Sequence, residues 1–439
     1  MASGMGSNHG IRWLLERPVG QRWSVAAIVL LGLLLRLWVA WGYNQWQPDS
    51  IAWLRGDEPG YNDTALELLA GYGYTWPGRV PLYPVWLAGV HWLTGTSYHD
   101  VRYVQAFLGA GTVLLTYLLS RRLFGHVTGL IAALLASLSY ILIHQSLHLL
   151  SEVLFTPVVL LIALRLWRAV EQPTTGSFAI AGIWIGISDL IRPTLLFLPI
   201  VLLWPLAVLL GWRSAIRHGS ILAAGVAVVI APWMIRNWIR YDAWFPLATS
   251  NAILWQGSPE YYKLIHEDGY TYMRIWKEVL YGPGWRIHDP TSIAGDRYWT
   301  ARAMKSIRGD PTTYLKYAAE KLGTYWVGDP NADWNNERIF SFRALRRIGF
   351  SRDAAVNVMI ARALPIVALI AIMVLWPQRR RLLPLYSILV YCTLLHAATH
   401  AEVRLSEPLQ PILLVLVAGA VVCQWQHRGE LKQVVLPAA

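Results

Sequence analysis

Two adjacent carboxylates, Asp57 and Glu58, occur in the stretch LRGDEPGYNDTALELLAGYGY, residues 54–74, directly after an apolar segment. Adjacent carboxylates on a loop do not easily aim at one atom, so we expect different roles for them. One would be a general base that takes a proton from a hydroxyl or amine nucleophile, and the other would bind a polar ligand or an arginine. The alternative is structural: Asp57 caps a helix that starts near Pro59, with Glu58 in its first turn.

Arginines at the ends of apolar segments form the second candidate group. They are Arg192 in GISDLIRP, Arg236 in APWMIRNW and Arg404 in HAEVRLSEPLQP, and Arg79 lies in the same loop as the carboxylates. Guanidiniums that converge at one membrane level suit a phosphate held at the interface, and a lipid phosphate is the anion naturally available there. The alternative is that each arginine snorkels to the interface on its own.

A third group combines histidines with a glutamate. His144, His148 and Glu152 follow one another at intervals of four in HQSLHLLSEVLF, which would place them on one helical face. Such a face could bind a divalent cation. No fourth ligand is evident, however, so the pattern favours the wall of a polar cavity, although HAATHAE at 396–402 repeats it. No cofactor is firmly predicted, and a divalent cation is the alternative.

The composition is that of an integral membrane protein. The 439 residues are 55% hydrophobic and 15% charged, and the mean hydropathy is +0.38, whereas a soluble chain of this size needs far more polar surface. A helix needs roughly 20 apolar residues to cross the hydrocarbon core. We therefore predict an all-α polytopic membrane protein with about ten transmembrane helices, at roughly 23–43, 100–120, 127–143, 149–167, 178–191, 194–211, 219–236, 355–376, 382–398 and 406–424.

Arginines in the short linkers predict the orientation. They lie before the first span, in every second linker and after the last span, so the basic residues collect on one side of the membrane. That side is cytoplasmic by the positive-inside rule, which also accounts for the net charge of +12 without nucleic acid. We expect a bacterial or archaeal plasma-membrane protein with both termini in the cytoplasm and a first span that is retained.

The predicted organisation has three parts. Residues 1–236 form an N-terminal transmembrane module that includes the first outer loop, 44–99, and residues 355–439 form the C-terminal transmembrane helices. Residues 237–354 contain no credible span and form a small, mostly helical extracytoplasmic domain. Within it, DPTTYLKYAAEKLGTYW begins with a good N-cap, Asp310, followed by a proline that suits the first helical position. Tryptophans of this segment would stack on sugar rings or, more simply, form its core.

Seven motifs follow one another over most of the chain: GDEPGYNDTALELLAGYGY, GRVPLYPVWLAGVHWLTG, LLSEVLFTPVVLL, GISDLIRPTLLFLPIVLL, APWMIRNW, FPLATSNAILWQGSPEYY and VRLSEPLQPILLVLVA. This succession resembles the GT-C glycosyltransferases that use polyprenyl-phosphate sugars, in particular the group of protein mannosyltransferases and lipid A aminoarabinose transferases (ArnT). The resemblance implies two helices along the membrane in the first outer loop, at about 59–71 and 80–94. It also implies that Asp57 is the catalytic carboxylate and that Arg404 contacts the carrier phosphate. Family members often have a second arginine where this chain has Ser406.

The expected function is transfer of a sugar, with inversion, from a polyprenyl-phosphate donor to an extracytoplasmic lipid, glycan or protein acceptor. A transporter or flippase of lipid-linked sugars is the alternative, and it predicts repeats or broken helices at mid-membrane. A non-catalytic scaffold with a sugar-binding domain would leave the carboxylates and arginines unexplained. The candidate site residues are the catalytic pair Asp57 and Glu58 and the substrate- or phosphate-binding residues Arg79, Arg192, Arg236, Arg404, Tyr61, Glu152 and His148.

Overall fold

Helices make up all the regular structure in the described part of the chain, in agreement with the predicted all-α class. The computed structural model describes residues 18–46, 49–50, 54, 56–243, 247–250, 252–282, 288–328 and 352–435. The bundle consists of α2 (Pro18–Trp46), α5 (Tyr98–Phe124), α6 (His126–Leu138), α7 (Tyr140–His144), α8 (Glu152–Glu171), α9 (Thr175–Ile191), α10 (Leu198–Val201), α11 (Leu203–Leu210), α12 (Trp212–Tyr241), α19 (Arg352–Val374), α20 (Arg379–Ala398) and α21 (Gln410–Val435).

Every predicted span contains helix, but not all of these helices are long enough to cross a membrane. Among the described residues, 6 helices are long and apolar enough to cross a membrane. The number rises to 7 if the bent pair α6 and α7 counts as one span. The apolar parts of α9, of α10 with α11, and of α19 are shorter, at 10–17 residues. The chain is thus a multi-pass membrane protein, and the number of about ten spans stays a prediction.

The predicted span at 127–143 is broken. The axes of the two pieces differ by 58°, because Ser139 between α6 and α7 is extended. A break of this kind removes partners from the last carbonyl groups of the first helix. Arg36, which is fully buried in α2, supplies one replacement, since its Nη2 donates a hydrogen bond of 3.3 Å to the Ala136 carbonyl.

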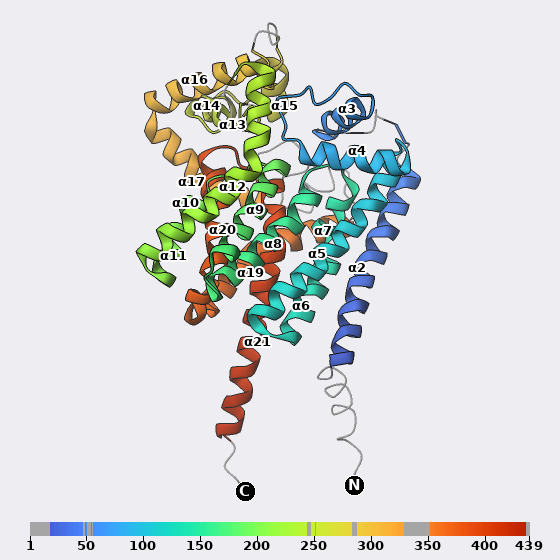
Figure 1. Ribbon diagram of the computed structural model, residues 1–439, viewed down its shortest axis with the longest axis vertical. Helices are drawn as coiled ribbons and strands as arrows, with labels where there is room; N and C mark the ends of the chain where they lie inside the picture. The colour runs from blue at the N-terminus through green and yellow to red at the C-terminus, as the bar shows by residue number, and fades with distance from the viewer. Residues whose placement is uncertain are drawn as a thin grey trace.

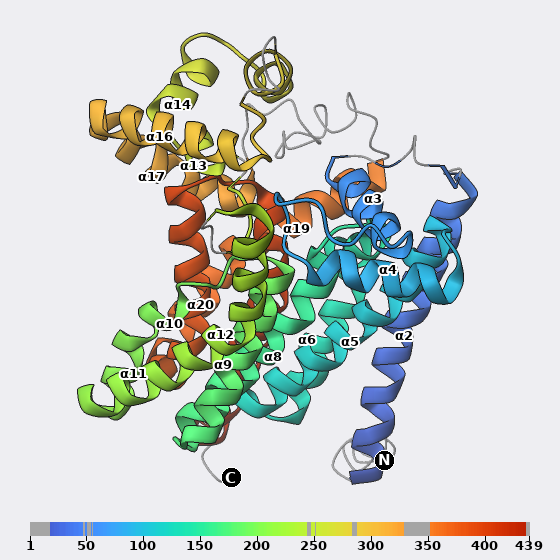
Figure 2. The same cartoon turned by 45° about the horizontal axis from the view of Figure 1, so that its top comes forward.

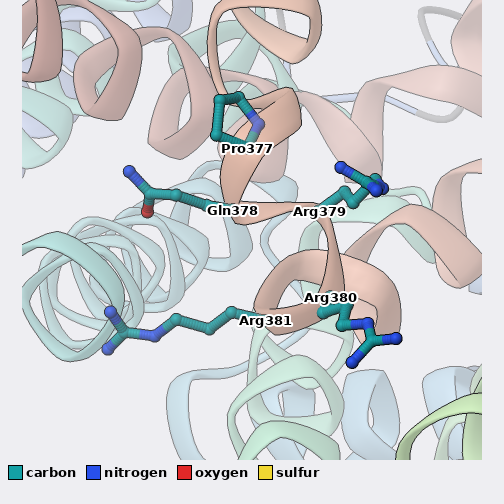
Figure 3. A pocket seen from close by; sticks show the side chains of 5 residues that line it. All are labelled: Pro377, Gln378, Arg379, Arg380 and Arg381. Atoms are coloured by element: carbon teal, nitrogen blue, oxygen red, sulfur yellow. The ribbon is translucent and has the colours of Figure 1, made fainter.

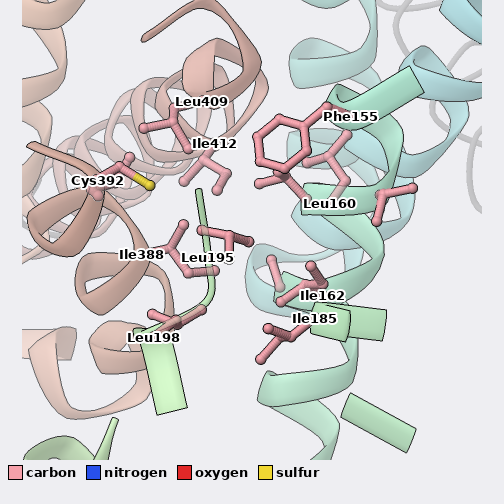
Figure 4. Close-up of a cluster of buried hydrophobic side chains, with 14 of the residues drawn as sticks. Phe155, Leu160, Ile162, Ile185, Leu195, Leu198, Ile388, Cys392, Leu409 and Ile412 are labelled. Carbon is pink, nitrogen blue, oxygen red and sulfur yellow. The ribbon is translucent and has the colours of Figure 1, made fainter. Parts of the chain in front are cut away.

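The bundle is held together by a continuous core of aliphatic side chains. Figure 4 shows one part of it, where Phe155 and Leu160 of α8 face Ile388 and Cys392 of α20, with Leu195 between them. All five side chains are at most 3% exposed. The beginning of α8 and the segment before α21 are fixed by this packing, and both carry site residues.

Two groups of helices lie at the same end of the bundle, as Figures 1 and 2 show. The first is the pair α3 (Glu58–Leu69) and α4 (Leu82–Thr94), which confirms the two helices implied for the first loop. The second group, here called the cap helices, has its own small core around Trp255 and Trp299. It comprises α13 (Ile253–Gln256), α14 (Pro259–His266), α15 (Tyr272–Ile275), η3 (Trp276–Leu280), α16 (Ile293–Gly309) and α17 (Pro311–Val327).

The cap helices begin and end much as their sequence predicts. Asp310 is the N-cap of α17, where its side chain accepts a hydrogen bond of 3.0 Å from the backbone N–H of Thr313, and Pro311 is the first helical residue. The expected three-part division of the chain stays a prediction. Part of the 237–354 segment, including the tryptophans at 244, 285 and 334, lies outside the described residues.

The opposite end of the bundle is basic. Residues Pro377 to Arg381 line a depression there, and the side chains of Arg379, Arg380 and Arg381 spread in different directions around it (Figure 3). Arg381 donates to the Arg122 carbonyl at 3.0 Å, which joins two of the linkers that the sequence assigns to one side. This meeting of basic linkers agrees with the predicted sorting of the arginines.

A buried lysine joins the cap helices to the bundle. Lys321 of α17 is 2% exposed. Its Nζ donates a hydrogen bond of 2.7 Å to the Thr399 carbonyl and one of 3.4 Å to the Gly257 carbonyl. Gly257 permits this close approach, since a Cβ at this position would lie 2.2 Å from the Thr399 carbonyl oxygen. Thr399 directly follows α20, so this contact fixes the start of the 399–405 segment.

We predict that Lys321 makes stability depend on pH. Burial lowers the pKa of Lys321 from its usual 10.5 to about 7. Between these two values the unfolded chain binds the extra proton, so the free energy of unfolding rises with pH, by at most about 1.4 kcal/mol per pH unit. Thermal unfolding of the purified protein from pH 7 to 9 should show this rise. Lys321→Met should flatten it, and an equal slope in that variant would contradict the assignment.

Candidate active site

A cavity of about 520 Å³ opens where the first loop, the cap helices and the ends of two bundle helices meet. Its walls come from the start of α3, the 76–80 loop, the end of α9, η3 and the 399–405 segment. The charged residues that line it are Asp57, Arg79, Glu152, Arg192, Glu402 and Arg404, together with His396 and His400. Six of the sequence-predicted site residues therefore line one cavity: Asp57, Tyr61, Arg79, Glu152, Arg192 and Arg404.

Asp57 does not cap α3 with its side chain, although it occupies the N-cap position. Instead, its Oδ1 lies 2.6 Å from Nη2 of Arg79 and its Oδ2 lies 2.9 Å from Nη2 of Arg404. Burial alone would raise the pKa of Asp57, but the two guanidiniums outweigh it and hold the pKa well below its usual range. Asp57 and Glu58 therefore have the positions that the structural alternative expects at the start of α3, but the Asp57 side chain pairs with two arginines in the cavity instead of capping the helix.

Arg79 is held rigidly beside Asp57. Its guanidinium lies 5.1 Å from the ring centroid of Trp76 and 5.5 Å from that of Tyr61, and its Nη1 donates 3.1 Å to the Gly78 carbonyl. Trp76 can lie against α3 because Gly60 has no side chain; a Cβ there would come within 2.6 Å of the indole. Cation–π contacts on two sides fix the orientation of this arginine.

A second carboxylate organises the other two arginines. Glu152, at the start of α8, is 3% exposed, and its Oε1 lies 2.7 Å from Nη1 of Arg192 and 3.4 Å from Nε of Arg404. Arg192 is the extended C-cap residue that directly follows α9, before Pro193. Arg404 consequently lies between two carboxylates, Asp57 and Glu152, and it connects the two halves of the charge cluster.

Glu402 is the third carboxylate in the cavity. Its Oε1 lies 2.8 Å from Nε2 of His400, and its Oε2 lies 3.8 Å from Nε of Arg404. Burial alone would raise the pKa of Glu402, but His400 and Arg404 outweigh it and lower the pKa to about 2. Three ionised carboxylates thus face three arginines, Arg79, Arg192 and Arg404, so their formal charges cancel.

Glu58 has a different position from its neighbour. It is 4% exposed and points into the protein, where its Oε1 accepts a hydrogen bond of 2.9 Å from the backbone N–H of Leu149 and lies 3.3 Å from Nδ1 of His148. It does not line the cavity. The expectation of different roles for the two carboxylates agrees with this geometry, in which Glu58 fixes the start of α3 against the segment before α8.

We predict that the role of Glu58 can be measured as stability. Glu58→Ala should lower the free energy of unfolding by about 1–3 kcal/mol, because it leaves the buried Leu149 N–H without its acceptor. Glu58→Gln keeps an acceptor oxygen and should retain most of the stability. Thermal unfolding in detergent compares the two variants, and an equal loss in both would contradict the hydrogen-bond assignment.

The histidine and glutamate pattern does not lie on one helical face. The helix ends at His144, residues 145–147 form a 3₁₀ turn, and His148 is extended before α8 begins at Glu152. His144 and His148 contact each other through their Nε2 atoms at 3.4 Å, whereas Glu152 pairs with arginines. Among the residues that the structure describes, no group of three His, Cys, Asp or Glu side chains is arranged to hold a metal ion.

Arg236 lies apart from the cavity. It donates to the Tyr74 carbonyl and, at 2.9 Å, to Asn237, and its guanidinium lies 4.7 Å from the ring centroid of Trp233. Tyr74 in turn donates from its hydroxyl to the Arg79 carbonyl at 2.9 Å. The expected convergence of Arg236 with Arg192 and Arg404 is therefore not seen, and Arg79 provides the third guanidinium. Arg236 instead anchors the loop that carries Arg79.

Ser406 does not face the cavity. It is 3% exposed, and its hydroxyl donates 2.8 Å to the Val403 carbonyl inside the 3₁₀ segment η6 (Val403–Leu409). Arg404 lies in the same segment. A side chain two residues after Arg404 thus stabilises the turn that presents this arginine.

Aromatic residues that the sequence did not single out complete the cavity. Trp76 from the first loop lines it, as do Tyr272, Trp276 and Tyr281 from the cap helices. Trp276 and Tyr281 stack, with ring centroids 5.0 Å apart. Flat apolar faces of this kind, next to charged groups, suit a ligand that has both a polar and an apolar side.

Comparisons with known proteins agree with this architecture. Residues 78–236 match the family described as dolichyl-phosphate-mannose-protein mannosyltransferase. A curated relative is the undecaprenyl phosphate-alpha-4-amino-4-deoxy-L-arabinose arabinosyl transferase 1 of Pseudomonas fluorescens (strain Pf0-1), which is 24% identical over 233 residues, or 49% of this chain and 39% of the relative.

Solved structures share the fold. The oligosaccharyltransferase of Archaeoglobus fulgidus, in complex with Zn and sulfate, superposes with a TM-score of 0.54 at 15% identity over 92% of this chain and 49% of that one. The archaeal oligosaccharyltransferase AglB from Archaeoglobus fulgidus, in complex with an inhibitory peptide and a dolichol-phosphate, superposes with a TM-score of 0.51 at 16% identity. This superposition covers 99% of this chain and 53% of that one. The chain spans about half the length of these structures and less of the curated relative. The motifs and the family match make this chain similar to the ArnT- and protein-mannosyltransferase-like group of the GT-C glycosyltransferases, and the solved structures show that it shares their fold.

Proposed function

We propose that this protein transfers a sugar from a polyprenyl-phosphate donor to an extracytoplasmic acceptor, with inversion at the anomeric carbon and Asp57 as the catalytic carboxylate. The observation that carries the proposal is the pairing of Asp57 with Arg79 and Arg404 in one cavity at the end of the bundle. The similarity to the GT-C group supports a lipid-linked sugar as the donor class. The curated relative is named for an undecaprenyl-phosphate sugar, and one structural neighbour binds a dolichol-phosphate.

The donor phosphate would bind between Arg192 and Arg404. Both guanidiniums line the cavity, and both are attached to segments that follow or begin apolar helices, the level at which a lipid phosphate lies. In the transfer step the bond between the anomeric carbon and the phosphate oxygen breaks, and the phosphate gains negative charge. Arginines placed beside that oxygen stabilise the charge more in the transition state than in the ground state.

The acceptor would approach Asp57 from the side of the cap helices. Its hydroxyl or amine gives a proton to the Asp57 carboxylate and attacks the anomeric carbon opposite the leaving phosphate. The proposal assigns Asp57 as a base and assigns no carboxylate as a nucleophile. A base that assists one direct attack corresponds to a single displacement with inversion. The aromatic residues Tyr272, Trp276 and Tyr281 would flank the sugar ring.

The proposed orientation follows from the two ends of the molecule. The basic linkers meet at one end, around Arg381 and Arg122, and that end would face the cytoplasm. The cavity would then face the outside or the periplasm of a plasma membrane, where nucleotide sugars are not available but lipid-linked sugars are. The acceptor class, whether lipid, glycan or protein, is left for experiment.

The test is a transfer assay with the purified protein in lipid. It uses a panel of radiolabelled undecaprenyl-phosphate monosaccharides, a membrane extract as the source of acceptors, and a nucleotide sugar as the control donor. We expect label to move from one lipid-linked donor and none to move from the nucleotide sugar. Label that stays on the lipid but crosses the bilayer of proteoliposomes would establish the transporter alternative, and transfer from the nucleotide sugar would contradict the donor class.

A further inference from the structure

The arrangement of Asp57 raises a problem for its proposed role. Both of its oxygens are already occupied: Oδ1 by Arg79 and Oδ2 by Arg404. A carboxylate that accepts two charge-assisted hydrogen bonds is a poor proton acceptor, because its negative charge is stabilised. In the state that the structure shows, Asp57 would need to lose one of these partners before it could take a proton from an acceptor.

The two arginines differ in how firmly they are held. Arg79 lies between the rings of Trp76 and Tyr61 and donates a second hydrogen bond to the Gly78 carbonyl. Arg404 is instead held by carboxylates: its Nη2 lies 2.9 Å from Asp57, and its Nε lies 3.4 Å from Glu152 and 3.8 Å from Glu402. Its side chain is also more exposed, at 31% against 21% for Arg79. Arg404 is therefore the partner that can leave Asp57.

We infer that Asp57 and the donor phosphate compete for Arg404, so that donor binding frees Oδ2 of Asp57 for the acceptor. The inference rests on the proposed function and adds an order to it, in which the base is exposed only after the donor is in place. The charges favour the exchange. The formal charges of the three carboxylates and three arginines cancel, and an incoming phosphate monoester or diester adds negative charge that Arg404 can meet by leaving Asp57.

The chemical step then balances. Arg404 and Arg192 hold the donor phosphate, and the acceptor O–H or N–H donates to the freed Oδ2. The acceptor atom bonds to the anomeric carbon as its proton passes to Asp57, and the electron pair of the breaking carbon–oxygen bond goes to the phosphate. When polyprenyl phosphate leaves, Arg404 returns to Asp57 and expels the proton to water. Without a donor, Arg404 keeps Asp57 inactive.

The test is binding of radiolabelled undecaprenyl phosphate to the full-length protein in detergent, without turnover. Because Asp57 competes for Arg404, Asp57→Asn should bind this lipid about tenfold more tightly than wild type, as expected for one charge-assisted hydrogen bond that no longer opposes binding. Glu402→Gln is the matched control. It also removes one negative charge beside Arg404, since the pKa of Glu402 is about 2, but it frees no guanidinium from a hydrogen bond. It should raise the affinity less than Asp57→Asn does, because it acts through charge alone.

A double mutant separates two causes of tighter binding, the release of Arg404 from Asp57 and the loss of a negative charge at position 57. In an Arg404→Gln background, Asp57→Asn should give no gain in affinity over Arg404→Gln alone. The inference is overturned if Asp57→Asn binds like wild type, if Glu402→Gln gives the same gain, or if the gain persists without Arg404. Thermal unfolding checks that each variant is folded. If undecaprenyl phosphate binds to wild type and to every variant with the same affinity, only the inferred exchange of Arg404 fails. If it does not bind to wild type at all, the proposed donor class fails as well.

Discussion

Asp57→Asn is expected to lower the transfer rate at saturating donor by about 10²–10⁴-fold, the usual contribution of a general base. The substitution keeps the shape of the side chain but removes the charge and the proton-accepting oxygen. The affinity for the donor should be kept or increased, so the loss belongs to the chemical step. Initial rates with the labelled donor identified by the panel, together with equilibrium binding of undecaprenyl phosphate, measure both quantities.

Asp63→Asn is the matched control for this prediction. Asp63 lies in α3, the helix that begins directly after Asp57, but it is exposed and does not line the cavity. The same chemical change there should leave the transfer rate within about twofold of wild type, as for most surface substitutions. Equal turnover by Asp57→Asn and wild type would show that this carboxylate is not part of the chemistry.

The second large effect is expected for Arg404→Gln. Removing a cation beside the departing phosphate should lower kcat/KM for the donor by about 10²–10³-fold, as the loss of one donor to a developing anion does in other enzymes. Arg404→Lys should recover part of this loss, because a lysine restores the charge but not the planar pair of donors. Kinetics over a range of donor concentrations separate the fall in kcat from the change in KM.

Arg381→Gln provides the control for the arginine. This residue lies at the opposite end of the bundle and contacts the Arg122 carbonyl. Its replacement removes the same charge from the protein without touching the cavity, so kcat/KM should change by less than about twofold. A loss in Arg404→Gln that is no larger than the loss in Arg381→Gln would contradict a direct contact between Arg404 and the phosphate.

Local patterns in the sequence predict the helices well. The apolar segments locate the bundle helices, and Asp310 with Pro311 marks the start of α17, because hydrophobic length and caps act over a few neighbouring residues. The same holds for the two helices of the first loop. Breaks are harder to predict. Nothing in HQSLHLLSEVLF indicates that the helix ends at His144, so the regular spacing of its polar residues suggested a common face that does not exist.

The site was only partly predictable for a related reason. Position along a span gives the depth of an arginine but not the direction in which it points around the helix. Arg192 and Arg404 reach the cavity, whereas Arg236, at the expected depth, turns to the Tyr74 carbonyl. The aromatic wall, with Tyr272 and Tyr281, comes from a segment without a clear periodic pattern. Its place over the charges depends on tertiary contacts, among them the Lys321 contact to Thr399.

The stereochemistry of a single turnover tests the central claim most directly. The enzyme is mixed with one equivalent of a polyprenyl-phosphate sugar labelled with ¹³C at the anomeric carbon, in the presence of its acceptor, and the product is analysed by NMR. A single displacement assisted by Asp57 predicts that the label appears on the acceptor with inverted anomeric configuration. Retained configuration, or label that never leaves the lipid phosphate, would contradict the mechanism.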